Sequence, residues 1–150
     1  MNTQIRIHQW LVVLLTALAF PIVAHAQTPT HKLAIQVDVN DPATMNLALN
    51  NAENVISFYE AKKEPIQVEV VAYGPGLHML RADTSPVKQR IAQMSLAHDN
   101  LRFDACEVTR AKMAEAEHKD IPIVTEGKSV PSGVVTLMEL EGKGYAYVRP

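Results

Sequence analysis

The chain has 150 residues, 47% hydrophobic and 20% charged, which suits one folded domain and is too apolar for a disordered protein. Its single cysteine excludes an internal disulfide and zinc sites built from several thiolates. The formal net charge of −2 gives no electrostatic basis for binding nucleic acid.

Residues 1–26 carry the three-part pattern of a secretory signal peptide. Arg6 supplies a basic start, and Trp10 to Val23 forms an apolar run. Ala24-His25-Ala26 then places small residues at the −3 and −1 positions of a cleavage site. The run is 14 residues long, short of the roughly 20 that span a bilayer, so an uncleaved membrane anchor is the weaker alternative. We therefore predict a periplasmic protein whose domain, residues 27–150, has no contact with the membrane after cleavage.

The first half of this domain reads as strand, helix, strand. His31 to Val39 alternates apolar and polar residues, which is typical of a strand. Asp41 then caps a helix that begins at Pro42 and ends before Lys62-Lys63-Glu64-Pro65. Ile66 to Tyr73 is rich in β-branched residues and forms the second predicted strand.

The chain then turns at Gly74-Pro75-Gly76, and Ser85-Pro86 opens the next predicted helix. Asn100 to Ala105 is a third strand candidate, and Glu107 to His118 has the composition of a helix. Between these two elements stands Cys106, so the predicted strand delivers the only thiol directly to the start of a helix.

The last third contains two alternatives for a fourth strand, Ile121 to Val124 and Lys128 to Val130. Ser132-Gly133 opens a helix that ends at Gly142 or Gly144. We expect one face of this helix to carry Val134, Leu137, Met138 and Glu141. Tyr145 to Arg149 is the last predicted strand.

This alternation of strands and helices predicts an α/β fold, a three-layer α/β/α sandwich with a mainly parallel sheet of about five strands. In such sheets the ligand or reaction site lies beyond the carboxyl ends of the strands. The residues expected at that edge are Asp38, Asn40, Gly74 to His78, Cys106 and Pro131 to Gly133.

Cys106 is the first candidate for a catalytic residue. The unpaired amides and the positive dipole end of the following helix favour a thiolate, which is the nucleophilic form of cysteine. Such a sulfur can attack a sulfane sulfur and hold it as a persulfide. The alternative is that Cys106 is a small hydrophobic residue packed at the end of a core strand.

His78 is the second candidate, because it follows the Gly-Pro-Gly turn at the same edge. The spacing of Glu117, His118 and Asp120 matches no usual metal site, and we predict no metal. Because the chain lacks a Cys-x-x-Cys pair, a G-x-G-x-x-G motif and a P-loop, we also predict no cofactor.

Four segments in order carry a resemblance to a known family: Val70 to Leu77, Leu101 to Cys106, Val130 to Val134 and Gly144 to Pro150. Over most of residues 32–150 the chain resembles the DsrE/DsrF-like family, in its small exported branch. The resemblance implies an α/β/α sandwich, a homo-oligomer and a part in sulfur relay, with a cysteine that carries persulfide. Cys106 matches the cysteine of the Phe-x-Ala-Cys motif typical of this branch.

We therefore predict a periplasmic sulfur carrier or sulfurtransferase-like protein. Cys106 would hold the sulfur and His78 would assist, and the partner would be a small sulfur species or a sulfur-relay protein. The alternative is a non-catalytic module that binds a ligand or assembles into an oligomer, with a structural Cys106.

Overall fold

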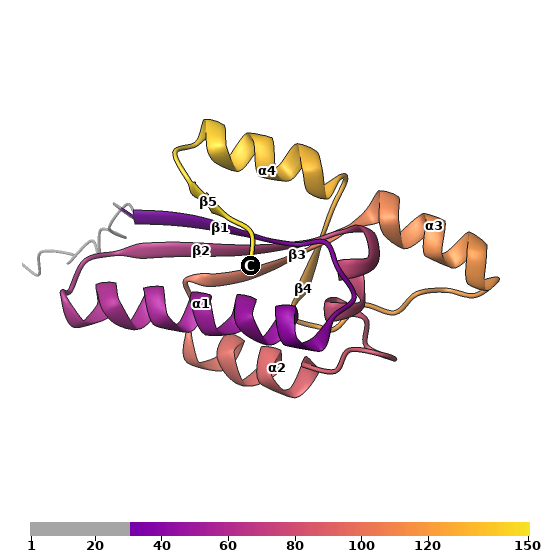
Figure 1. Ribbon diagram of the computed structural model, residues 1–150, viewed down its shortest axis with the longest axis horizontal. Coiled ribbons are helices and arrows are strands. Elements are labelled where there is room, and N and C mark those ends of the chain that lie inside the picture. Colours follow the sequence, from indigo (N-terminus) through magenta and orange to yellow (C-terminus); the bar gives the residue numbers. More distant parts are fainter. Residues whose placement is uncertain (1–30) are drawn as a thin grey trace, which may run out of the picture.

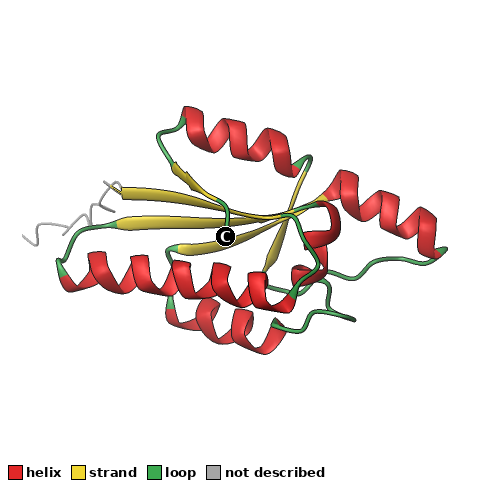
Figure 2. Cartoon of the chain, viewed as in Figure 1, coloured by secondary structure: helices red, strands yellow, loops and turns green. Residues whose placement is uncertain are grey.

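The computed structural model describes residues 31–150, which form a five-stranded sheet between layers of helices (Figures 1 and 2). The predicted signal peptide, residues 1–26, lies outside the described residues. The strands are β1 (His31–Val37), β2 (Ile66–Ala72), β3 (Leu101–Cys106), β4 (Gly127–Val130) and β5 (Ala146–Val148). The helices are α1 (Pro42–Ala61), the 3₁₀ helix η1 (Gly74–Leu80), α2 (Lys88–Ala97), α3 (Glu107–Glu117) and α4 (Gly133–Gly142).

All four strand pairings are parallel, and the order across the sheet is β4-β3-β2-β1-β5. Strands β1 to β4 therefore lie side by side in sequence order, and the chain then crosses to the opposite edge to add β5. Because every strand runs the same way, all carboxyl ends meet at one edge of the sheet. This arrangement confirms the predicted fold class.

Helices α1 and α2 cover one face of the sheet, and α4 covers the other (Figure 1). Helix α3 continues from the carboxyl end of β3 and leads away from the sheet edge (Figure 1). Within residues 31–150, each helix is too short or too polar to cross a membrane.

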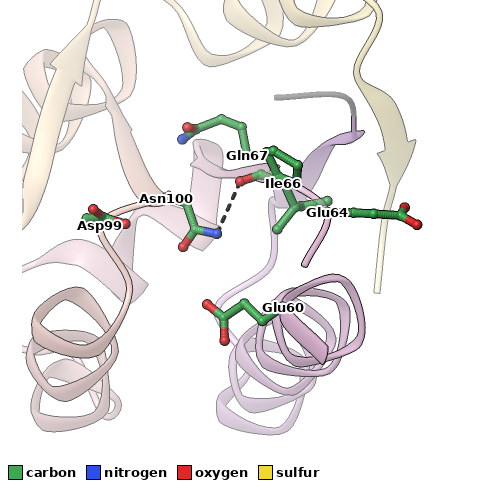
Figure 3. Close-up of a pocket in the computed structure, with 7 residues that line it drawn as sticks. Glu60, Glu64, Ile66, Gln67, Asp99 and Asn100 are labelled. Carbon is green, nitrogen blue, oxygen red and sulfur yellow. Dashed lines mark hydrogen bonds between the residues drawn. The ribbon is translucent and has the colours of Figure 1, made fainter. Parts of the chain in front are cut away.

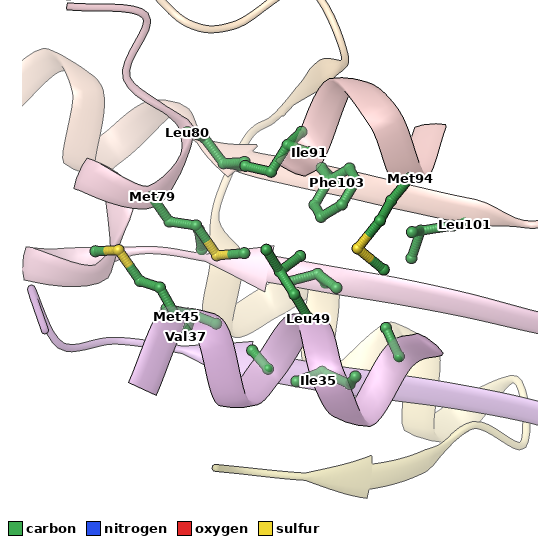
Figure 4. Close-up of a cluster of buried hydrophobic side chains, with 14 of the residues drawn as sticks. Ile35, Val37, Met45, Leu49, Met79, Leu80, Ile91, Met94, Leu101 and Phe103 are labelled. Carbon is green, nitrogen blue, oxygen red and sulfur yellow. The ribbon is translucent and has the colours of Figure 1, made fainter. Parts of the chain in front are cut away.

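The face under α1 and α2 holds the main core (Figure 4). Alternate residues of the strands, such as Ile35, Val70 and Phe103, point into it and are almost fully buried. Met45 and Leu49 of α1 pack against them at helical spacing. Each such side chain contributes roughly 1.5–3 kcal/mol by leaving water. This cluster is much larger than the one on the other face, so it supplies most of the apolar burial.

The face under α4 is different, because several of its strand residues are polar. Ala34 and Val71 pack against Leu137 and Leu140 of α4 and form only a small second core. The buried polar residues Gln36, Glu69 and Asp104 share this face of the sheet. An apolar layer and a polar layer thus flank the same parallel sheet.

The observed strands correct one predicted boundary and decide between the two alternatives for the fourth strand. β1 ends at Val37 rather than Val39, which is exposed beyond the sheet. Of the two alternatives for the fourth strand, the one around Lys128 to Val130 is right, because β4 is Gly127–Val130. Ile123 of the other segment makes only an isolated antiparallel bridge with Arg81.

Two further local predictions are corrected. Gly74-Pro75-Gly76 is not a simple turn but the start of the 3₁₀ helix η1. The stripe predicted for α4 is partly wrong, since its buried residues are Gly133, Leu137 and Leu140, whereas Val134 and Met138 are exposed. The contact that fixes this face is the close approach of Gly133 to Tyr73, which a local apolar pattern does not contain.

Candidate functional site

Cys106 ends β3 and is the N-cap residue of α3. It is 4% exposed and is paired in the sheet with Val130, the last residue of β4. The chain leaves β4 at Val130 and starts α4 three residues later, so the first turns of α3 and α4 both begin next to the sulfur.

The sulfur of Cys106 is surrounded by hydrogen-bond donors. Burial raises the pKa of the thiol, but hydrogen bonds from the Thr109 hydroxyl and the backbone N–H of Gly133 lower it. The backbone N–H groups of Thr109 and Val108 act in the same direction. The donors prevail, so the pKa of Cys106 lies below its usual value. Amides from two helix N-termini therefore favour the thiolate, which is the form that reacts.

Gly133 reaches this position because it has no side chain. A Cβ atom there would lie 2.8 Å from the Cβ of Tyr73, a separation that real structures do not show. Any larger residue would push the start of α4 away from β2. The glycine therefore lets the N–H of α4 approach the sulfur.

Thr109 connects Cys106 with the neighbouring loop. Its hydroxyl oxygen accepts a hydrogen bond from the backbone N–H of Gly74 at 2.9 Å. The hydroxyl proton then remains to point at the sulfur of Cys106. One side chain thus fixes the start of η1 and supplies a donor to the thiolate.

His78 lies on η1, with Nδ1 at 3.0 Å from the hydroxyl of Thr84. Its position depends on Gly76, where a Cβ would lie 2.2 Å from the carbonyl oxygen of Val37, so η1 presses directly on the end of β1. His78 and Thr109 both line a cavity of about 520 Å³ between η1 and α3. Lys112 adds a positive charge to the wall, and Val108 and Met113 add apolar surface.

The structure therefore brings the two predicted site residues into one neighbourhood without direct contact. His78 lines the cavity, whereas the sulfur of Cys106 lies behind Thr109, which forms part of the cavity wall. Within residues 31–150, no hydrogen bond joins His78 to Cys106.

An ion-pair network links the two elements that flank this cavity, η1 and α3. Arg81, directly after η1, is 1% exposed and donates to both carboxylate oxygens of Asp83, at 2.9 and 2.8 Å. It also donates to Glu117, the last residue of α3, at 2.9 Å. These contacts lower the pKa of Asp83 and of Glu117. The fork of Arg81 thus ties the end of η1 to the end of α3.

Glu117 therefore has a structural partner, and His118 is the left-handed C-cap of α3 with φ 50°. Across residues 31–150, no group of three or more His, Cys, Asp or Glu side chains is arranged to hold a metal ion.

Sequence reasoning missed Thr109. A signal for it exists: Thr109 is three residues after the N-cap Cys106, and side chains at that helical position commonly reach back to the cap. It also missed Asp104 and Glu69, two buried carboxyl side chains on the α4 face. Gly133 belongs to the predicted sheet edge, but its role as a donor depends on its contact with Tyr73.

A further cavity, of about 350 Å³, lies at the opposite edge of the sheet (Figure 3). Glu60, Glu64 and Asp99 line it, and Asn100 donates to the carbonyl oxygen of Ile66 at 3.1 Å. It contains neither predicted site residue and lies at the amino ends of β2 and β3, away from the edge where Cys106 stands.

No family model matches this chain, and no curated protein matches it. Among solved structures, the chain is similar to a protein of unknown function from Methanobacterium thermoautotrophicum. The TM-score is 0.66 and the identity 27%, over 80% of this chain and 99% of that one. The likeness agrees with the α/β/α architecture and carries no activity with it.

Proposed function

We propose that this chain is a sulfur carrier or sulfurtransferase-like protein of the DsrE/DsrF-like type, with the transferred sulfur held as a persulfide on Cys106. The observation that carries the proposal is the surrounding of one thiol by donors from Thr109 and from the first turns of α3 and α4. The same donors that favour the thiolate suit the terminal sulfur anion of a persulfide.

Loading needs no external oxidant. The thiolate of Cys106 attacks the sulfane sulfur of a donor such as thiosulfate, whose S–S bond breaks. Sulfite leaves with the bonding electron pair, and a new S–S bond forms on Cys106. An acceptor thiolate then attacks the outer sulfur, and Cys106 leaves as a thiolate.

The cavity lined by His78 and Thr109 is the proposed entry for the donor. An anionic sulfur species is favoured there by the charge of Lys112 and by hydrogen bonding to His78. Thr109 must turn its hydroxyl aside to expose the sulfur. His78 would assist by binding the donor rather than by contacting Cys106.

The test is the intact mass of the purified protein after exposure to thiosulfate or to polysulfide. Because Cys106 is the only cysteine, a gain of one sulfur atom that is reversed by dithiothreitol assigns the adduct to this residue. Cys106→Ser should show no gain. A folded wild-type protein that stays unmodified at pH 8 with both donors would rule out the carrier role.

A second candidate is a non-catalytic assembly or ligand-binding module with a structural cysteine. It is favoured by the 4% exposure of Cys106, which is typical of packed cysteines. If Cys106→Ser lowers stability but leaves every measured sulfur transfer unchanged, this second function is the right one.

We also propose that the protein is a homo-oligomer. The outer side of α4 exposes Val134, Val135 and Met138, the last of them 67%. Apolar residues gathered on one helix favour contact with a second copy. Light scattering should give an oligomer that Met138→Glu dissociates, whereas Leu96→Glu, at a still more exposed residue of α2, should leave it intact.

The proposed location is the periplasm, on the signal-peptide pattern of residues 1–26. Protein recovered from a periplasmic extract should begin at Gln27. A full-length chain in the cytoplasmic fraction would contradict this location.

A further inference from the structure

A cavity of about 410 Å³ lies between the α4 face of the sheet and α4 itself. It shares no lining residue with the cavity of His78. Side chains from β2, β3, β4 and the α4 region line it, and most of them carry charge. The charged and titratable ones are Glu69, Arg102, Asp104, Lys128, Glu139, Lys143 and Tyr145.

Two carboxyl groups stand at the base of this cavity. Asp104 of β3 is paired with Val71, two residues after Glu69 on β2, so Glu69 and Asp104 lie on the same face of neighbouring strands. Their residues are 6% and 1% exposed. Two carboxyl side chains are thus buried together in a layer that contains little apolar packing.

Their surroundings differ sharply. Glu69 accepts a hydrogen bond from the hydroxyl of Tyr145 at 2.8 Å, and Arg102 lies 3.9 Å from the same oxygen. Both oxygens of Asp104 are buried, and neither receives a donor from residues 31–150. If the two carboxyl groups share a proton, it forms one hydrogen bond between Glu69 and one oxygen of Asp104. The other oxygen of Asp104 still lacks a partner.

Buried polar atoms are paired in most proteins, and a buried carboxylate without a partner destabilises the folded state. Asp104 therefore marks a place where an external donor fits. The donor must be compact and cationic, because it meets two acids at once.

The exposed charged residues that line the cavity are Lys128, Lys143 and Glu139, and the partly exposed Arg102 adds a further cation, so positive charge predominates at the rim. Lys128 and Lys143 both line it, and neither ammonium group forms an ion pair within residues 31–150. The cavity thus offers acids at its base and cations near its mouth, and its volume lies within the range of small-molecule sites, about 300–1,000 Å³.

From this arrangement we propose that the cavity binds a free α-amino acid, with its ammonium group on Glu69 and Asp104 and its carboxylate toward Lys128 and Lys143. The site is independent of the chemistry proposed for Cys106. An amino acid carries one positive and one negative group, which are complementary to the acids and the lysines of this cavity.

Binding should depend on pH. Burial, followed by the contact with Glu69, raises the pKa of Asp104 to about 7, while Arg102 and Lys128 oppose this. Glu139, Lys143 and Tyr145 complete the charged and titratable groups around it. An arriving ammonium replaces the proton held by the two carboxyl groups. Binding should therefore release a proton and strengthen between pH 6 and pH 8.

The test is calorimetric titration of the wild-type protein with each common amino acid, in two buffers that differ in ionisation enthalpy. At least one amino acid should bind, with proton release at pH 6.5. The matched probes are the amine and the acid that share its side chain, such as ethylamine and propionate for alanine. Each should bind roughly tenfold or more weakly, because each lacks one charged contact.

Asp104→Asn should weaken the binding by roughly tenfold or more and abolish the proton release. Asp99→Asn, on the loop before β3, is the control and should bind normally. Cys106→Ser should also bind normally, which separates this site from the sulfur chemistry. The proposal is wrong if no amino acid binds, or if propionate alone binds as well as alanine.

Discussion

The hydroxyl oxygen of Thr109 lies 2.9 Å from the backbone nitrogen of Gly74 and accepts a hydrogen bond from its N–H group. This contact orients the hydroxyl so that its own hydrogen is free for the sulfur of Cys106. The side chain of Thr109 therefore connects the start of η1, helix α3 and the thiol of Cys106. The reactivity of Cys106 should respond to Thr109 more than to any distant charge.

Thr109→Val should raise the pKa of the Cys106 thiol, because it removes the hydroxyl donor and keeps the shape of the side chain. We expect alkylation by iodoacetamide at pH 7 to slow by roughly tenfold, the effect of one hydrogen bond to a charged group. The measurement is the alkylation rate against pH. Thr109→Ser retains the hydroxyl and should behave like the wild type; equal rates in all three proteins would contradict the role of Thr109.

Gly133→Ala should destabilise the fold by about 1–3 kcal/mol, the usual cost of overpacking. Its Cβ would meet the Cβ of Tyr73 at 2.8 Å and move the N-terminus of α4 from the sulfur. Urea unfolding measures the first effect, and a slower alkylation of Cys106 measures the second. Gly142→Ala is the control, since no atom lies within 4 Å of its added Cβ; if both variants unfold alike, the close approach at Gly133 has no energetic weight.

The layers of the fold could be predicted because the signals that define them are local. The apolar alternation of β2 and the capped start of α1 at Asp41 both lie within short windows of sequence. The end of β1 at Val37 and the 3₁₀ form of η1 depend on a contact between distant parts of the chain. Gly76 packs closely against Val37, 39 residues earlier in the sequence, and a pattern read from neighbouring residues does not reveal such a contact.

The site was partly predictable for the same reason. Parallel strands bring their carboxyl ends together, so Cys106 and Gly133 were expected at one edge. The buried pair of Glu69 and Asp104 requires the register between β2 and β3, which pairs Val71 with Asp104. Sequence alone gives no register between strands that are separated by η1 and α2.

His78→Gln should slow loading of Cys106 by thiosulfate roughly tenfold without changing its alkylation profile. The imidazole lines the cavity but makes no hydrogen bond to the sulfur, so its loss should affect donor binding and leave the thiol itself unchanged. Persulfide formation against thiosulfate concentration gives the measurement. His118→Asn, at the left-handed C-cap of α3, serves as control; a parallel fall in both proteins would place the effect outside the cavity.

Glu117→Gln should lower the stability of the protein at neutral pH. Its stability should also fall less than that of the wild type as the pH is lowered. Hydrogen bonding to Arg81 lowers the pKa of Glu117 in the folded protein. Its contribution is therefore present above the ordinary carboxyl pKa and is lost as the pH falls through the lowered value. Melting temperatures between pH 7 and pH 2.5 test this, and the variant should converge with the wild type in acid. Glu115→Gln, exposed on the same helix, should keep the wild-type curve.

Asp104→Asn should stabilise the protein at alkaline pH, which is the opposite trend. The pKa of Asp104 is raised to about 7, first by burial and then by Glu69. The folded protein thus holds a proton that the unfolded chain releases near pH 4, so stability is full below pH 4 and falls as the pH rises toward 7. The neutral amide has no such dependence and can donate to Glu69.

We expect Asp104→Asn to exceed the wild type by roughly 2–4 kcal/mol at pH 8 and to match it near pH 4. Urea unfolding in buffers free of amines and amino acids measures this without a ligand in the cavity. Asp99→Asn should follow the wild type at both pH values. A variant that is weaker than the wild type by the same amount at pH 4 and pH 8 would show that Asp104 is ionised throughout and is held by donors from the protein itself.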